Sequence, residues 1–220
     1  MPKTNLTNEL YEYALQIGAK EHPILKEIHQ FNLSLPTGRM QIPPEQSQFM
    51  GLMAQIANAK KYLELGVYTG YSSLSMALHM GKNSRLYAID NNQEHLNIAT
   101  KFWTQANVID QFIVLCGDGT NVLHSLLTNE HVETFDIAFI DANKSDYIQY
   151  FEYCYKLVKP GGIIFIDNVF MGGKVLLDNP PNFARAVIEF NQFLSNDNRV
   201  KISVLPMADG LTIAYKERIA

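Results

Sequence analysis

Two short polar segments in the second half of the chain combine side chains that can hold a cation. Residues 141–144 read Asp-Ala-Asn-Lys and residues 167–168 read Asp-Asn. Carboxylate and amide oxygens are hard ligands that suit Mg²⁺, Mn²⁺ or Ca²⁺, and two uncompensated carboxylates would repel each other. Asp and Asn after strands are also common helix caps, in which case Lys144 would be a solvated helix residue. The combination of both segments favours the cation site.

An earlier segment has the composition of a ligand-binding turn. Residues 64–73 read Glu-Leu-Gly-Val-Tyr-Thr-Gly-Tyr-Ser-Ser. Gly66 and Gly70 let the backbone turn tightly and approach a ligand without a Cβ in the way. Ser72 or Ser73 can cap the next helix, whose N-terminus attracts a carboxylate such as that of S-adenosylmethionine (SAM). A tight turn without a ligand is the alternative; a dinucleotide site is disfavoured because the Gly-x-Gly-x-x-Gly spacing is absent.

Two further acidic residues follow apolar runs. Asp90 ends the run Tyr-Ala-Ile-Asp, where a carboxylate can accept hydrogen bonds from both hydroxyls of a ribose. Its alternative role is that of a helix N-cap. Residues 117–119 read Gly-Asp-Gly, which predicts a contact of Asp118 and Gly119 with an adenine, although the same residues also make a good turn.

Short apolar runs and amphipathic segments alternate in a way that would place all these residues together. We expect buried parallel strands at 62–65, 85–89, 112–116, 135–140 and 162–166. Helical spacing between them, as in 93–107 and 147–158, predicts a doubly wound α/β sheet. Segments 201–205 and 211–215 leave no room for a helix and should pair antiparallel at one edge. In such sheets ligands bind at the carboxyl ends of the strands, where the strand order reverses.

The elements predict a single domain with two parts. Residues 1–58 have helical patterns, with Pro43-Pro44 opening the last of these N-terminal helices. Residues 59–220 should form a mostly parallel, seven-stranded sheet with an antiparallel C-terminal hairpin. This is the outline of the Rossmann-like fold of SAM-dependent methyltransferases.

Composition limits the class of protein. The chain has 220 residues, 47% of them hydrophobic, which suits one core, and its net charge of -4 argues against a nucleic-acid partner. No apolar stretch reaches the length of a membrane span, and the polar start lacks the apolar stretch of a secretory signal. Cys116 and Cys154 are too far apart in sequence to suggest a disulfide framework or a zinc site. We therefore expect a cytoplasmic protein.

The chain resembles the metal-dependent class I SAM O-methyltransferase family, which includes caffeoyl-CoA and catechol O-methyltransferases, and most of all its bacterial caffeoyl-CoA type. The matching segments run from the N-terminal helices to the last strand: 40–42, 45–49, 64–72, 139–144, 161–162 with 167–168, and 205–212. The order of the glycine segment, Asp-Ala-x-Lys and Asp-Asn is the most specific part of the match.

The resemblance implies a role for particular residues. The metal ligands would be Asp141, Asp167 and Asn168, and Lys144 would be the catalytic base beside Asp141. The SAM contacts would be Met40, Ile42, Glu64, Gly66, Ser72, Asp90 and Asp141. To these we add Tyr68, as a cation–π or dipolar contact of the sulfonium or as a packing residue. The resemblance also implies a homodimer.

The expected activity is transfer of a methyl group to a hydroxyl of a small aromatic diol, catechol-like or hydroxycinnamoyl, with Mg²⁺ or else Mn²⁺ or Ca²⁺. Lys144 can accept the proton if its pKa falls from ~10.4 toward ~7–8. Asn143 and Met171 depart from the family, which commonly has Asp and often Trp there, so the acceptor is the least defined part of the prediction. A nicotinamide-dependent oxidoreductase and a non-catalytic SAM-binding protein are the alternatives.

Overall fold

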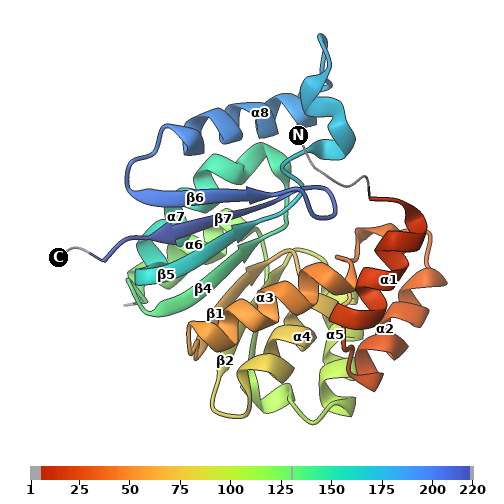
Figure 1. Ribbon diagram of the computed structural model, residues 1–220. Helices are drawn as coiled ribbons and strands as arrows, with labels where there is room; N and C mark the ends of the chain where they lie inside the picture. Colours follow the sequence, from red (N-terminus) through yellow and green to blue (C-terminus); the bar gives the residue numbers. More distant parts are fainter. Residues whose placement is uncertain (1–5, 130, 219–220) are drawn as a thin grey trace.

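A computed structural model describes residues 6–129 and 131–218, and its centre is a single sheet of seven strands (Figure 1). The strands are β1 (Lys61–Leu65), β2 (Arg85–Asp90), β3 (Phe112–Cys116), β4 (Phe135–Ile140), β5 (Val158–Ile166), β6 (Val200–Leu205) and β7 (Leu211–Lys216). Their order is β3-β2-β1-β4-β5-β7-β6. Strands β1 to β5 pair in parallel, and β7 pairs antiparallel with both β5 and β6. The predicted sheet and its terminal hairpin are therefore confirmed.

Helices cover both faces of the sheet (Figure 1). They are α1 (Asn8–Gly18), α2 (Pro23–Leu33), α3 (Pro44–Ile56), α4 (Tyr71–Met80), α5 (Gln93–Gln105), α6 (Gly119–Thr128), α7 (Tyr147–Leu157) and α8 (Asn182–Ser195). One hydrophobic cluster packs helices α2, α3, α4 and α5 against one face of the sheet. A second cluster packs helices α6, α7 and α8 against the other face. In the part of the chain that the structure describes, no helix is both long and apolar enough to cross a membrane.

The period-two pattern of the central strands explains the two clusters. In β1, Tyr62 belongs to the cluster under α2 to α5, whereas Leu63 and Leu65 belong to the cluster under α6 to α8. All three side chains are fully buried. A strand that is buried on both faces reads as a continuous apolar run, which is why these strands were recognisable in the sequence.

The parallel strand predicted at 112–116 is confirmed as β3, but the prediction that it is buried is wrong. This strand lies at the edge of the sheet and pairs only with β2. Val114 and Cys116 are exposed, and the other residues of β3 are only partly buried. An apolar run shows that a segment is a strand, but its place in the sheet depends on which strands pair.

Trp103 is buried in the core, as its helical spacing with Leu96 and Ala99 predicts. Its ring is stacked on Phe112 with 3.9 Å between the ring centroids, and its Nε1 donates a hydrogen bond of 3.3 Å to the carbonyl of Gly70. A Cβ on residue 70 would lie 2.6 Å from the Ala99 Cβ. Gly70 is therefore required by the packing of α5 against the turn before α4.

The prediction that Ser72 or Ser73 caps α4 is wrong. The N-cap position is occupied by Gly70 in a left-handed conformation, and no side chain makes a capping hydrogen bond there. Because α4 begins at Tyr71, both serines lie inside its first turn. The Ser73 hydroxyl donates to the Gly70 carbonyl, and the Ser72 hydroxyl donates to Glu64.

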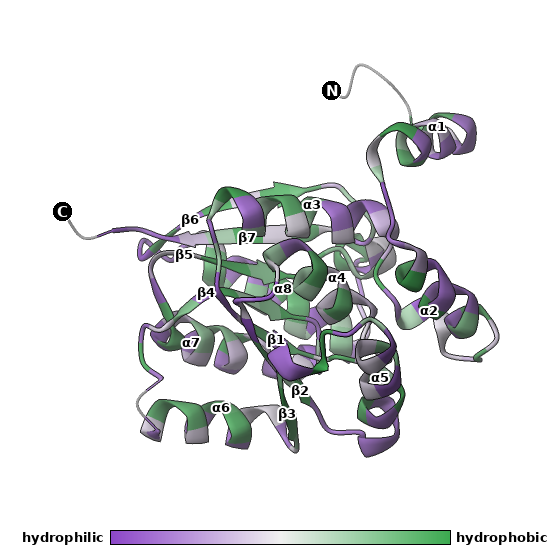
Figure 2. Ribbon diagram, turned by 90° about the horizontal axis from the view of Figure 1, so that it is seen from below, coloured by the Kyte–Doolittle hydropathy of each residue, from purple (hydrophilic) through white to green (hydrophobic). Residues whose placement is uncertain are grey.

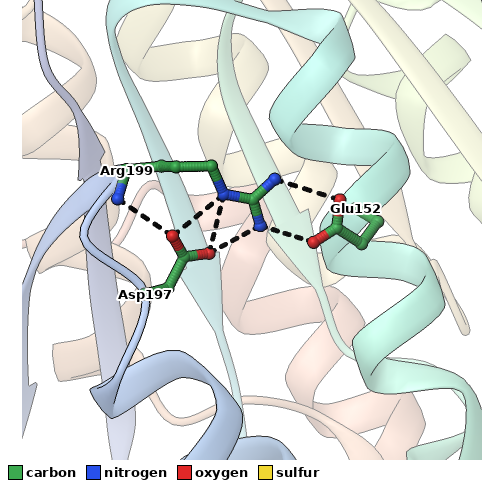
Figure 3. Close-up of polar contacts among 3 residues, drawn as sticks. All are labelled: Glu152, Asp197 and Arg199. Atoms are coloured by element: carbon green, nitrogen blue, oxygen red, sulfur yellow. Dashed lines mark hydrogen bonds and ion pairs between the residues drawn. The ribbon is translucent and has the colours of Figure 1, made fainter.

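An ionic cluster ties the hairpin edge to α7 (Figure 3). Arg199, just before β6, donates from Nε to Asp197 at 2.9 Å and from Nη1 to Glu152 of α7 at 3.2 Å. The guanidinium carbon also lies 4.5 Å from the ring centroid of Tyr155. These contacts connect the loop after α8 to the layer that covers β4 and β5.

We predict that Gly66→Ala destabilises the fold much more than Gly81→Ala. Both glycines have a positive φ, of 88° and 77°, where an L-residue is strained by about 1–3 kcal/mol even when there is space for its side chain. A Cβ on residue 66 would also lie 1.8 Å from the Asp141 carbonyl oxygen, whereas nothing lies within 4 Å of a Cβ on residue 81. Urea unfolding should separate the two variants, and equal losses of unfolding free energy would contradict the close approach at Gly66.

Candidate active site

A cavity of about 1040 Å³ opens at the carboxyl ends of the parallel strands. The residues that follow β1, β2, β3, β4 and β5 line it, and residues 39–43 close another side. The strand order reverses between β1 and β4. The cavity therefore lies where a doubly wound sheet binds its ligands.

Most of the predicted site residues line this one cavity. They are Met40, Ile42, Gly66, Tyr68, Asp90, Asp118, Gly119, Asp141, Lys144, Asp167 and Asn168. Of the predicted site residues, all of which the structure describes, only Glu64 and Ser72 are absent from the lining. The topology has thus brought together residues that are more than a hundred positions apart in the chain.

Glu64 is a buried carboxyl group with two hydroxyl donors. Its side chain is 0% exposed, the Tyr62 hydroxyl donates to it at 2.8 Å, and the Ser72 hydroxyl donates to its other oxygen. Burial raises the pKa of Glu64 to about 8, although the hydrogen bonds from Ser72 and Tyr62 act in the opposite direction. Glu64 and Ser72 therefore join the end of β1 to the first turn of α4, next to the lining residue Leu65.

Asp90 organises the turn after β2. One carboxylate oxygen accepts the backbone N–H of Tyr68 and the other accepts that of Asn92, both at 2.9 Å. Asn92, and not Asp90, is the N-cap of α5, so the capping alternative for Asp90 is wrong. Asp118, by contrast, caps α6 by accepting the Asn121 N–H at 3.0 Å. Both carboxylates still line the cavity and keep further lone pairs for a ligand.

Tyr68 connects the glycine turn to the N-terminal helices. Its hydroxyl is 2.9 Å from the hydroxyl of Thr37, which lies beside the lining residues 39–43. The adjacent Thr69 donates a hydrogen bond of 2.8 Å to Asn32 in α2. These contacts attach residues 39–43 to the glycine turn, and both segments line the cavity.

The acidic end of the cavity contains two carboxylates on neighbouring strands. Lys144 Nζ lies 2.8 Å from Asp141 Oδ1 and 5.1 Å from the ring centroid of Tyr147. Asp167 is 3% exposed, and its carboxylate accepts the backbone N–H of Asn168 at 2.8 Å. Burial and the charge of Asp141 raise the pKa of Asp167 above its ordinary value. Neither aspartate caps a helix, so the capping alternative fails for both.

The donor set at this end fits a divalent cation. Asp141, Asp167 and Asn168 offer only oxygen ligands of the kind that Mg²⁺ and Mn²⁺ accept. Burial and then the charge of Asp141 raise the pKa of Asp167, and a cation would offset both effects. Within residues 6–129 and 131–218, no cluster of three or more His, Cys, Asp or Glu side chains can hold a metal. The predicted set does not need one, because its third ligand is an amide.

The charge of the whole lining is negative. The cavity lining contains six aspartates but only three lysine or arginine side chains. The aspartates are Asp90, Asp118, Asp141, Asp146, Asp167 and Asp209, and the basic residues are Arg39, Lys144 and Lys174. A cavity with this excess of carboxylates attracts positively charged ligands. Both a sulfonium compound and a metal cation meet that condition.

The two departures from the family both lie at the cavity. Asn143 donates a hydrogen bond of 2.6 Å to Asp146, so its amide is already engaged. Met171 has a φ of 50° and begins the 3₁₀ segment Met171–Leu176. These residues therefore shape one wall of the cavity without changing the predicted metal ligands.

The sequence did not point to a role for several lining residues, among them Gln46, His95 and Asp209. His95 packs edge-on against Tyr68, and its Nδ1 lies 3.9 Å from Asp90. Asp209 accepts the backbone N–H of Gly172 at 2.6 Å and so holds the 3₁₀ segment after β5. The sequence did contain a signal for His95, because this residue lies in the first turn of α5, directly after the strand β2 that ends at Asp90.

Comparison with known proteins gives a consistent result. A family model described as O-methyltransferase matches residues 15–217. A caffeoyl-CoA O-methyltransferase of Populus kitakamiensis is 36% identical over 220 residues, covering 96% of this chain and 93% of the relative. The mouse catechol O-methyltransferase domain-containing protein 1 is 34% identical over 210 residues, covering 95% and 80%. The Streptomyces achromogenes O-methyltransferase TomG, solved in complex with SAM, is 26% identical with a TM-score of 0.85, covering 96% and 97%.

We predict that Glu64→Gln removes part of the pH dependence of stability. The pKa of Glu64 rises from its ordinary value of 4.5 to about 8 on folding. Between these values the folded protein keeps a proton that the unfolded chain releases, so the contribution to stability is complete below about pH 4.5 and is lost as the pH rises to about 8. As the pH rises through this range, the unfolding free energy of the wild type should fall by up to about 1.4 kcal/mol per pH unit relative to that of the variant.

Urea unfolding of both proteins from about pH 5 to pH 8, without SAM or metal, measures this difference. Asp167 has a pKa shift of the same sign but is present in both proteins, so the difference between them isolates Glu64. Parallel stability curves would show that Glu64 is not held protonated.

Proposed function

The chain belongs to the O-methyltransferase family and is a SAM-dependent O-methyltransferase, and we propose that it methylates a hydroxyl of a small catechol-like or hydroxycinnamoyl aromatic with the help of a divalent cation. One observation carries this proposal. Asp141, Asp167 and Asn168 lie at one end of the cavity with Lys144 beside them. Mg²⁺ is the cation we expect first, with Mn²⁺ or Ca²⁺ as alternatives.

The size of the cavity supports two small ligands at once. A volume of about 1040 Å³ slightly exceeds the usual range for ligand pockets, which is about 300–1,000 Å³. Two relatives carry the words catechol and caffeoyl-CoA in their names, and both words denote aromatic diols. A vicinal diol would present two adjacent oxygens to the acidic end.

We assign the other end of the cavity to SAM. Asp90 would accept the ribose hydroxyls, and Asp118 with Gly119 would contact the adenine. Gly66 and Tyr68 would lie along the methionine portion, with Met40 and Ile42 on the opposite wall. Glu64 and Ser72 support the turn from within the core and would act on the cofactor only through it.

The chemistry needs a base as well as a methyl donor. The acceptor oxygen forms a bond to the methyl carbon as the carbon–sulfur bond breaks, which leaves a neutral thioether and releases the hydroxyl proton. A bound divalent cation would supply Lewis acidity at the hydroxyl and a template for two adjacent oxygens. Lys144, which lies 2.8 Å from Asp141, is the residue to which we assign acceptance of this proton.

The two alternative functions lose their support. Membership of the O-methyltransferase family excludes the nicotinamide-dependent oxidoreductase and argues against a SAM-binding protein without catalysis.

We further propose a homodimer that uses the N-terminal helices. Apolar side chains on α1 and α3, including Leu10, Ile17, Leu52 and Ile56, are exposed, and α1 stands apart from the sheet (Figure 2).

Chelation provides the direct test of the cation. Excess EDTA should abolish methyl transfer and Mg²⁺ or Mn²⁺ should restore it. Asp167→Ala should reduce turnover by at least about a hundredfold, because a metal ligand orients the reacting oxygen. Asp146→Ala is the matched control, since Asp146 is another cavity carboxylate that already pairs with Asn143. Full activity of the wild type in excess chelator would rule out the metal.

The choice of acceptor tests the diol. Catechol should be methylated about a hundredfold faster than phenol at saturating SAM and Mg²⁺, because a lone phenol binds through one oxygen and loses orientation. The difference should appear in kcat, with the affinity for SAM unchanged. Similar turnover of catechol and phenol would remove chelation of two oxygens as the source of specificity.

A further inference from the structure

The side chain of Gln46 is a buried amide without a partner. It lies in the first turn of α3, is 0% exposed, and lines the cavity. Neither its Nε2 nor its Oε1 has a hydrogen-bond partner among residues 6–129 and 131–218. Leaving one buried polar group unpaired costs about 1–3 kcal/mol, so the chain tolerates a penalty at this position.

Two other glutamines, the buried Gln111 and the partly buried Gln41, show what a paired amide looks like. Gln111 is 5% exposed, and its oxygen accepts a hydrogen bond of 2.7 Å from Ser84. Gln41 accepts from Asn32 at 2.8 Å and has its nitrogen 2.8 Å from His29. Within the described residues, the two amide atoms of Gln46 are the only buried side-chain polar atoms that lack a partner.

The position of Gln46 points to the acceptor and not to the cofactor. Its amide is close enough to the Asp167 carboxyl group to lower the pKa of that group, but the two do not reach the geometry of a hydrogen bond. Asp167 follows β5, whereas Asp90 and Asp118 follow β2 and β3, and strands β1 and β4 lie between the two groups. A ligand bound beside Asp167 would therefore lie close to the Gln46 amide.

We propose that Gln46 is a specificity-determining residue whose amide hydrogen-bonds a hydroxyl oxygen of the acceptor. This inference rests on the proposed function, because it places the acceptor at the acidic end. The amide both donates and accepts, and a hydroxyl does the same, so the two groups satisfy each other. An acceptor that carries a hydrogen atom or an ether in place of this hydroxyl would leave the Gln46 amide partly unpaired. A polar pocket rejects ligands that leave its buried polar groups without a partner.

The proposal predicts opposite effects of one substitution on stability and on acceptor binding. Gln46→Met keeps the length of the side chain and removes the unpaired amide. The thermal midpoint of the ligand-free protein should stay the same or rise, whereas the KM for the acceptor should increase about tenfold to hundredfold. Gln111→Met is the matched control: it breaks an existing hydrogen bond far from the cavity, so the midpoint should fall and the KM should not change.

The experiment compares the three full-length proteins with whichever acceptor the wild type turns over fastest among catechol, caffeic acid and their mono-hydroxy analogues. Calorimetric titrations with SAM and with Mn²⁺ alone should agree within about twofold between the wild type and Gln46→Met. An unchanged acceptor KM overturns the proposal. A loss of Mn²⁺ affinity in Gln46→Met would also overturn it, because the amide would then act on Asp167. A fall in the thermal midpoint of Gln46→Met as large as that of Gln111→Met would overturn it as well.

Failure of the proposed function would look different. It would appear in the wild type itself, as a preference for a mono-phenol or as activity without metal. The Gln46 comparison would then still be read on the preferred acceptor, because it needs only a hydroxyl next to the amide.

Discussion

The close contact between the ends of β1 and β4 sets the position of both halves of the cavity. The carbonyl oxygen of Asp141 occupies the place where a side chain on residue 66 would be. Hydrogen bonds of 2.9 Å from Gly66 to Ile89 and from Asp141 to Leu65 continue the sheet up to this contact. The turn assigned to SAM and the acidic end assigned to the acceptor therefore share one backbone junction, and neither can shift without the other.

The electrostatics of the site work against the stability of the empty protein. Folding buries Asp167 near Asp141 and encloses Glu64 completely, and both buried carboxyl groups have raised pKa values. The rest of the cavity lining adds more carboxylates than bases. Positive ligands relieve this repulsion, so binding and folding are linked, and the protein with its ligands should be more stable than the chain alone.

Much of the fold was predictable because its signals are local. The apolar runs at 112–116 and 135–140 match β3 and β4, and the polar residues after the strands fall at the cavity because parallel strands end on the same side. What the sequence did not reveal depends on contacts between distant segments. The edge position of β3, the pairing of Ser72 with Glu64 and the unpaired amide of Gln46 each follow from tertiary packing, which no local pattern encodes.

The stacking of Trp103 on Phe112 gives the protein a built-in optical reporter. The chain contains a single tryptophan, so the fluorescence obtained by exciting tryptophan selectively over the eleven tyrosines comes from one known environment. The indole is fully buried, and its N–H is bonded to the carbonyl of Gly70, at the end of the turn that contains Gly66 and Tyr68. Any rearrangement of that turn on ligand entry alters the polarity around the indole. The emission spectrum of the unlabelled protein thus monitors the glycine turn directly.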